Sequence, residues 1–260
     1  MEQITPIPAF QDNYIWLIRN DAGTHAIIVD PGDAAPVKEI LEKEQLTLSA
    51  ILITHHHFDH IGGINELVNK YHPVVFGPAN ESIPSCTHSL KENETIQVEG
   101  FSQHFRVIDV PGHTLGHIAY YSDQFSPPAL FCGDTLFSAG CGRLFEGTPQ
   151  QMFESLQKLA ALPGHTQVFC THEYTLSNLK FAQHVEPGNK QIEKRIDEVV
   201  RLRKENLPSL PTTIDQELTI NPFLRTDQSI IKQSAEAKSG CEICEPVQTF
   251  ATLRTWKNDF

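Results

Sequence analysis

The sequence predicts an α/β protein with a smaller helical domain at its C-terminal end. In the first two thirds of the 260 residues, short apolar runs typical of buried strands alternate with loops and amphipathic helical patterns. Beyond about Tyr174, helical periodicity dominates and strand-like runs are no longer found. An apolar fraction of 40% is enough to form a hydrophobic core. We therefore expect an α/β domain over residues 1–173 and a helical domain over residues 174–260.

The expected strands are apolar runs that stop at turn residues. His25–Val29 ends at the turn formed by residues 30–32, where Asp, Pro and Gly follow one another. Ala50–Ile53 leads directly into a cluster of histidines. Further strands are expected at Val74–Phe76, Phe105–Val110, His117–Tyr121, Ala129–Cys132 and Val168–Cys170.

The expected helices show apolar residues at helical spacing. Pro36 is expected to open the first helix. Thr148 is expected to cap a later helix that has Pro149 at its first position. The residues expected on buried helical faces are Val37, Ile40 and Leu41; Ile61, Ile64, Leu67 and Val68; Met152, Phe153, Leu156 and Leu159; and Ile192, Ile196, Val199 and Val200.

Composition limits the classes of partner and compartment. A formal net charge of −12 argues against nucleic acid or an anionic membrane as the main partner, because both need a basic face. The sequence contains neither a secretory signal nor the ~18 consecutive apolar residues that a membrane span needs. Cysteines such as Cys132 and Cys170 lie in apolar runs, which is typical of reduced, buried thiols. We expect a cytoplasmic protein, and a monomer because no feature indicates an interface.

A cluster of histidines at residues 54–60, with the sequence Thr-His-His-His-Phe-Asp-His, predicts a metal site. Alternate side chains of an extended segment share a face, so His55 and His57 can point into one site. Asp59 and His60 follow where the chain turns into a helix, and can bind a second ion beside the first. Imidazole nitrogen and carboxylate oxygen suit zinc, iron or manganese.

Three further candidate ligands follow apolar strand-like runs. They are His113, Asp134 and His172, and loops at strand ends are where a rigid scaffold gathers functional groups. The whole set divides between two metal ions if Asp134 bridges them, and Asp59 and Asp134 are its predicted catalytic carboxylates. The seven predicted ligands are His55, His57, Asp59, His60, His113, Asp134 and His172.

Other polar residues have simpler interpretations. His56 points away from its neighbours, and His117 is expected to support a ligand rather than to be one. Asp30 is either a carboxylate that orients a ligand or an ordinary turn residue. The pair Cys241 and Cys244 has metal or redox spacing but no partner pair, so no metal is expected there. The histidines expected outside the site are His25, His72, His88, His104, His165 and His184.

The motif His-x-His-x-Asp-His with downstream His, Asp and His resembles the metallo-β-lactamase superfamily. That resemblance implies a four-layer αββα sandwich. Four further stretches are similar to the glyoxalase II (hydroxyacylglutathione hydrolase) family: residues 12–14, 133–137, 140–147 and 171–175. The similarity runs nearly end to end, including the closing residues 254–257.

The family resemblance implies hydrolysis of S-D-lactoylglutathione to glutathione and D-lactate, the second step of methylglyoxal detoxification. His55, His57 and His113 would hold one metal and Asp59, His60 and His172 the other, with zinc the first expectation. The positions similar to those that bind the glutathione moiety are Arg143, Tyr174, Arg254 and Lys257. Phe145 occupies a position where some relatives have Tyr, so one hydroxyl contact to the substrate is absent here.

The chemistry follows from the two metals. A hydroxide bridging them is a nucleophile at neutral pH, because the ions lower the pKa of bound water to about 7. The leaving thiolate, from a thiol of pKa about 8.5, needs no dedicated general acid. Three alternatives remain open: an iron persulfide dioxygenase of the same fold, a lactonase or β-lactamase, and a metal-binding protein without activity.

Overall fold

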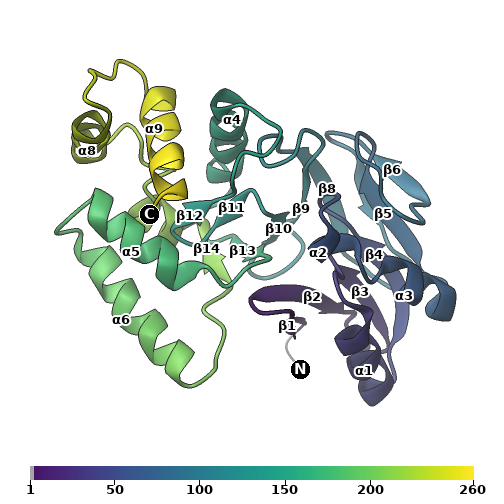
Figure 1. Cartoon of the computed structure of the whole chain (residues 1–260). Helices are drawn as coiled ribbons and strands as arrows, with labels where there is room; N and C mark the ends of the chain where they lie inside the picture. The colour runs from purple at the N-terminus through teal and green to yellow at the C-terminus, as the bar shows by residue number, and fades with distance from the viewer. Residues whose placement is uncertain (1–2) are drawn as a thin grey trace. The chain divides into compact units, whose positions relative to one another are not determined.

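The computed structural model describes residues 3–260 and contains two six-stranded sheets together with helices (Figure 1). The first sheet has its strands in sequence order, antiparallel from β1 to β3 and parallel from β3 to β6. Its strands are β1 (Ile4–Ala9), β2 (Asn13–Arg19), β3 (His25–Val29), β4 (Thr47–Leu52), β5 (Val74–Pro78) and β6 (His88–Leu90).

The second sheet has the strand order β14-β13-β10-β9-β8-β7, and a separate hairpin is formed by β11 and β12. The strands are β7 (Thr95–Gln97), β8 (His104–Asp109), β9 (Ile118–Ser122), β10 (Ala129–Gly133), β11 (Leu136–Phe137), β12 (Gly140–Cys141), β13 (Gln167–Cys170) and β14 (Thr212–Thr213). All seven strands expected from the sequence are present, with bounds within three residues of those expected.

Contacts divide the chain into two compact units. One comprises Met1–Asp109 with Gly116–Gly133, and the other Val110–Leu115 with Asp134–Phe260. These bounds describe clusters of contacts, whereas the domain boundary expected at residues 173/174 marks a change of sequence pattern. That domain boundary stays a prediction.

In the first unit, α1 (Ala34–Glu44) and α3 (Ile64–Tyr71) pack apolar residues against the first sheet. The apolar stripe predicted at Ile61, Ile64, Leu67 and Val68 packs on the core of this unit, but two helices carry it. α2 (Phe58–Ile61) and α3 are separate helices, divided at Gly62 and Gly63. A Cβ on Gly63 would lie 2.6 Å from Ala34 N and 2.7 Å from Pro31 O, so the chain must come this close to the turn after β3.

The second unit contains the remaining helices: α4 (Pro149–Ala160), α5 (Thr175–Val185), α6 (Lys190–Lys204), α7 (Ile214–Ile220), α8 (Ser229–Ser239) and α9 (Pro246–Asn258). Thr148 caps α4 as predicted, and Gln151 completes a capping box. The expectation that no strand follows Tyr174 was wrong, since β14 pairs antiparallel with β13. Two threonines are too few to produce a periodic signal.

No helix among the described residues is both long and apolar enough to cross a membrane.

Candidate metal centre

The segment after β4 and the short helix α2 that follows it carry two predicted ligands each. His57 is the N-cap residue of α2, and His55 and His60 are buried on either side of it. His55 Nε2 lies 3.1 Å from His57 Nδ1, so these two alternate side chains do share a face. The extended backbone after β4 brings them together, as the alternation predicted.

Asp30, directly after β3, holds this segment in place. Its carboxylate accepts hydrogen bonds from the Thr54 backbone N–H (2.8 Å) and hydroxyl (2.7 Å). It also lies 3.1 Å from His60 Nδ1. A carboxylate at Nδ1 orients the ring and directs Nε2 toward a metal. The geometry therefore favours the ligand-orienting role for Asp30 over that of an ordinary turn residue.

Asn13, at the start of β2, plays a similar part for Asp59. Its Nδ2 donates to Asp59 Oδ2 over 3.0 Å, and Asn13 is buried. In the sequence, Asn13 stands out only as part of residues 12–14, one of the stretches that resemble the family. No spacing or periodicity links residue 13 to residue 59.

Asp134 lies between two of the predicted histidines. Its Oδ2 is 3.4 Å from His113 Nε2, and its Oδ1 is 3.4 Å from His172 Nε2. His113 Nδ1 hydrogen-bonds to the Arg143 carbonyl over 2.8 Å, which directs Nε2 toward Asp134. His172 stacks on the Tyr174 ring, with centroids 4.7 Å apart. One carboxylate oxygen toward each histidine is the arrangement a bridging ligand needs.

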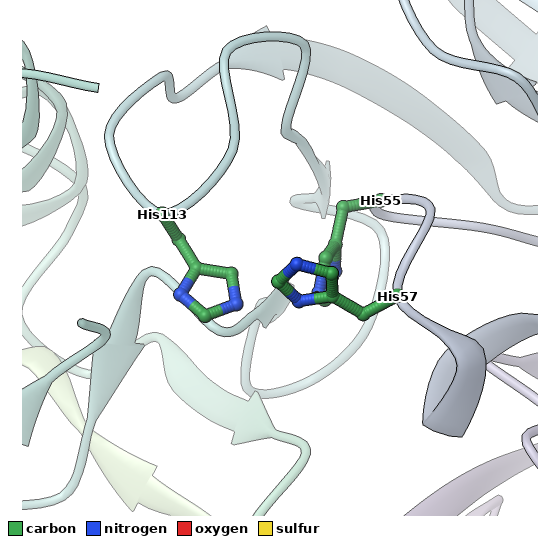
Figure 2. A group of neighbouring side chains, drawn as sticks. All are labelled: His55, His57 and His113. Atoms are coloured by element: carbon green, nitrogen blue, oxygen red, sulfur yellow. The ribbon is translucent and has the colours of Figure 1, made fainter. Parts of the chain in front are cut away.

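All seven predicted residues fall into groups that could hold a metal ion. In each group, one potential ligand atom from each residue lies within 4.8 Å of the others. Figure 2 shows the first group, in which three imidazole rings point toward one another. The groups are His55, His57 and His113; His55, His60 and Asp134; and Asp59, His60 and His172.

The other histidines of the described chain are outside these groups. His56 points instead to Glu81, with Nδ1 3.0 Å from Oε2. His117 is buried and stacks on His55 with centroids 4.6 Å apart, so it supports a candidate ligand. Cys241 and Cys244 are free, exposed thiols.

The donor set fits a divalent transition metal. Imidazole nitrogens and carboxylate oxygens converge, and the residues of these groups are buried or half-buried. This is the chemistry that zinc, iron and manganese sites use. Lone pairs gathered this closely repel one another unless a cation or protons lie among them.

A cavity of about 390 Å³ in the second unit gathers all five predicted substrate residues. His113 and Asp134 also line it, so candidate metal ligands and substrate residues share one space. The predicted residues are Arg143, Phe145, Tyr174, Arg254 and Lys257. The lining residues that were not assigned to the site from the sequence are Phe137, Cys141, Ser177, Asn178, Asn258 and Phe260.

The three cationic side chains of the cavity have different environments. Arg254 is only 5% exposed, and its Nη1 donates to the Cys141 carbonyl over 2.7 Å. Arg143 is exposed, and Lys257 is half-buried. Burial lowers the pKa of the Lys257 ammonium to about 8, with a further contribution from the positive charges of Arg254 and Arg143.

Phe145 is exposed at the cavity. Its side chain is 63% accessible, and its ring meets His113 edge to face with centroids 5.2 Å apart. Cys141 is buried, and this burial raises the pKa of its thiol, although Arg254 opposes the shift. A buried thiol of raised pKa is a poor nucleophile, so the cavity offers no alternative to metal chemistry through Cys141.

The chain matches two family models that together cover residues 10–260. Residues 10–172 match the metallo-beta-lactamase superfamily, and residues 173–260 match the hydroxyacylglutathione hydrolase C-terminus. The hydroxyacylglutathione hydrolase of Aliivibrio salmonicida is 54% identical over 258 residues, with 99% of each chain covered. That of Photobacterium profundum is 52% identical over 261 residues, with both chains fully covered.

Solved structures share the fold at lower identity. The BLEG-1 B3 metallo-beta-lactamase is 26% identical with a TM-score of 0.64, covering 85% of this chain and 99% of that one. TTHA1623 in a di-iron-bound form is 25% identical with a TM-score of 0.61, covering 85% and 100%. ETHE1 from Myxococcus xanthus is 22% identical with a TM-score of 0.62, covering 96% and 98%, and indicates the fold alone.

Proposed function

The chain belongs to the hydroxyacylglutathione hydrolase family of the metallo-β-lactamase superfamily, and we propose that it hydrolyses S-D-lactoylglutathione to glutathione and D-lactate. The protein is a metal-dependent hydrolase with a metallo-β-lactamase fold and a helical C-terminal domain. The predicted resemblance to this family and its fold is confirmed. Its histidine and aspartate groups support a site for two metal ions.

We propose the division of the ligands between two ions that the family resemblance implies. His55, His57 and His113 would hold one ion and Asp59, His60 and His172 the other, with Asp134 between them. We propose zinc as the native metal, with iron and manganese acceptable to the same donors. The di-iron-bound form of TTHA1623 supports the two-metal arrangement and iron as an alternative. When bound, the two ions supply a nucleophile from water at neutral pH and polarise the thioester carbonyl.

Cationic side chains would bind the glutathione moiety. The formal net charge of the chain is −12, so an anionic substrate needs a local positive region. Arg143 and Lys257 offer such a region at the wall of the cavity. Arg254 supports that wall through its hydrogen bond to Cys141 O. Tyr174 and Phe145 add aromatic surface on the same cavity.

The reaction places few further demands on the protein. A glutathione thiolate leaves without prior protonation, because an unperturbed thiol has a pKa of about 8.5. Asp30 and Asn13 would keep His60 and Asp59 in their orientations throughout. The Arg143 carbonyl would do the same for His113.

The observation that carries the proposal is the cavity that combines two candidate metal ligands with the five proposed substrate residues. The test measures the loss of the thioester of S-D-lactoylglutathione with purified, metal-loaded protein. A lactoyl thioester of N-acetylcysteamine, which lacks the glutathione carboxylates, is the matched control and should react with a much higher KM. Oxygen consumption with glutathione persulfide in the absence of thioester hydrolysis would assign the chain to a dioxygenase instead.

We further propose that the protein acts as a cytoplasmic monomer without nucleic-acid or membrane partners. Six free cysteines, three of them buried, suit a reducing compartment. The negative net charge supports the absence of nucleic-acid binding. The proposed domains remain residues 1–173 for catalysis and 174–260 for substrate binding, and the junction of the two family matches at residues 172 and 173 supports that division.

A further inference from the structure

The β11–β12 hairpin connects Asp134 to Arg143, so it joins a proposed metal ligand to a proposed substrate residue. Leu136 pairs with Cys141, and Phe137 with Gly140. The turn between the strands includes Ala139, whose φ of 55° is a left-handed conformation that costs free energy in a non-glycine residue. A two-stranded hairpin this short is not stable by itself, so its position must be set from outside.

Glu217, in the middle of α7, and Asn221, its C-cap residue, provide that outside support. The Glu217 carboxylate accepts the Ala139 backbone N–H through Oε2 over 2.7 Å. Asn221 Nδ2 lies 3.1 Å from Phe137 O, 2.9 Å from Gly140 O and 3.0 Å from Glu217 Oε2. The carbonyls of both hairpin strands and the N–H of the turn are thus bonded to one pair of side chains. We call Glu217 and Asn221 the hairpin clamp.

The clamp is buried and fully hydrogen-bonded. Glu217 and Asn221 are both 0% exposed, and Thr212 donates its hydroxyl to Glu217 Oε1 over 2.7 Å. Burial raises the pKa of the Glu217 carboxyl, while hydrogen bonds from Thr212, Ala139 and Asn221 oppose that shift. A buried carboxyl group is costly unless its partners compensate. We therefore expect Glu217 to serve a positional role, which is to fix the backbone of the hairpin.

The hairpin forms part of the wall of the substrate cavity. Phe137 and Cys141 line the cavity, whereas Glu217 and Asn221 do not. The Phe137 ring meets Tyr174 edge to face with centroids 5.4 Å apart, and Arg254 bonds to Cys141 O. A shift of the hairpin would therefore move the cavity wall and the chain that leads to Arg143.

We propose that Glu217 and Asn221 are positioning residues for the thioester hydrolysis. They contact neither substrate nor metal ligands, and act by fixing the hairpin that shapes the glutathione end of the cavity. The inference rests on the proposed function. Asp134 adjoins the hairpin, whereas the other six candidate ligands lie outside it, so we expect most of the metal to be retained when the clamp is changed.

The test compares three substitutions in the full, metal-loaded protein. Glu217→Leu removes the acceptor for the Ala139 N–H while filling the space. Glu217→Gln can keep an acceptor oxygen at the position of Oε2, with its amide N–H at the position of Oε1 donating to the Thr212 hydroxyl, so it should rescue the wild-type behaviour. Glu186→Leu is the matched control, because Glu186 is also a buried carboxylate, bonded to Arg225 and Asn189 and outside the substrate cavity.

Two readouts separate positioning from general stability. For Glu217→Leu we expect KM for S-D-lactoylglutathione to rise about three- to tenfold, with most of the metal retained. We also expect the alkylation rate of Cys141 by iodoacetamide, measured by mass spectrometry, to rise about tenfold or more, since an unsatisfied N–H loosens the turn. Cys132 and Cys170, which are buried elsewhere, should keep their slow rates. The Glu186→Leu variant should lose stability without either change.

Equal KM and equal Cys141 alkylation in folded Glu217→Leu and wild-type protein would overturn the proposal. So would a joint rise in the alkylation of all three cysteines, because that indicates global unfolding. If Glu217→Leu does not fold, Asn221→Ala provides the same test, and failure of both to fold would assign the clamp to stability alone. A wild-type protein that does not hydrolyse the thioester would reject the proposed function. The alkylation assay needs no substrate, so it would still test whether Glu217 and Asn221 fix the position of the hairpin.

Discussion

Asp134 differs from the other proposed ligands because its two oxygens face two different histidines, His113 and His172, each over 3.4 Å. We expect Asp134→Ala to lose both metal ions and His172→Ala to lose mainly one, since the first removes a shared ligand and the second a terminal one. Elemental analysis of the two purified variants measures this directly. Equal metal content and equal rates would contradict the bridging role.

Lys257 should give the reaction an alkaline limit. The pKa of its ammonium is lowered to about 8, chiefly by burial, so the free enzyme loses this positive charge as the pH rises through 8. Affinity for an anionic substrate should fall over the same range. We expect kcat/KM, corrected for spontaneous thioester hydrolysis, to decline above about pH 8, since that ratio reports the pKa values of the free enzyme.

The control for this pH dependence is Lys257→Arg, because a guanidinium stays charged at every pH used. The variant should keep its activity to higher pH than the wild type. An identical decline in both proteins would show that another group titrates there.

Phe145 is a position where one added atom has a defined effect. The ring is 63% exposed at the cavity, so a hydroxyl in Phe145→Tyr remains in contact with water or substrate and is not buried without a partner. If the new hydroxyl forms one hydrogen bond to the glutathione moiety, worth roughly 0.5–1.5 kcal/mol, we expect KM to fall about two- to twelvefold with kcat nearly unchanged. Steady-state kinetics measure this, and an unchanged KM in a protein of normal thermal stability means that residue 145 does not face the glutathione moiety.

The residue types of the site could be predicted from the sequence, but not their environments. Arg254 and Lys257 were expected to play the same part, yet Arg254 is buried over the Phe223 ring and bonds to the backbone. Burial of a particular side chain depends on tertiary packing, which motif spacing does not encode. Asn13 and Glu217 were not assigned a role for the same reason, because their partners are distant in sequence.

At the scale of helices and strands, the prediction succeeded for seven apolar runs but missed two longer strands, β1 and β2. β3 has the predicted bounds, and α4 begins at the predicted cap. β11, β12 and β14 have two residues each, so they contain no measurable period and were not predicted. The division between α2 and α3 was also missed, because it results from the approach of Gly63 to the turn after β3.

Gly133, at the end of β10, is another close approach, and its replacement should be costly. Its φ is 48°, and an added Cβ would lie 2.3 Å from Thr54 Oγ1, the hydroxyl that bonds to Asp30. We expect Gly133→Ala to destabilise the fold by about 2–4 kcal/mol and to lower the metal content. Urea denaturation and elemental analysis measure the two effects.

Gly23 provides the matched control. Its φ is 67°, but a Cβ there would meet nothing within 4 Å. Gly23→Ala should therefore lower the free energy of unfolding by only about 1–2 kcal/mol, the cost of a left-handed backbone conformation in a residue with a Cβ, and leave the metal content unchanged. Equal losses of stability and metal in both variants would show that the contact with Thr54 is unimportant.

At the scale of the whole molecule, the family motif predicted more than local patterns could. Alternating strands and helices indicated an α/β fold, but only the ligand motif with its downstream partners identified the metallo-β-lactamase superfamily, which the family matches confirm. The contact units have different bounds from the predicted domains, because residues 110–115 and 134–173, which were predicted to belong to the first domain, cluster with the C-terminal helices. The predicted boundary marks the point where the sequence pattern changes from strands and helices to helices alone. The bounds of the contact units instead depend on which segments pack together.

Metal removal should lower the stability of the whole protein. Ions that bind only the folded state stabilise it by about 2.7 kcal/mol at a hundred times Kd. For a chain of this size, that corresponds to about 5–11 °C in Tm. We expect this decrease after dialysis against a strong chelator and its reversal on adding zinc. Calorimetry with and without metal provides the measurement, and an unchanged Tm would contradict a firmly bound pair of ions.

The spread of the proposed ligands along the chain has a consequence for biosynthesis. The histidines after β4 leave the ribosome early, whereas His172 follows β13, far later in the sequence. An early nascent chain therefore exposes a partial imidazole cluster that can bind a single ion without its eventual partners. The order of emergence makes completion of the proposed metal site a late event of synthesis. An ion captured early is then either kept in place or exchanged when the remaining ligands arrive.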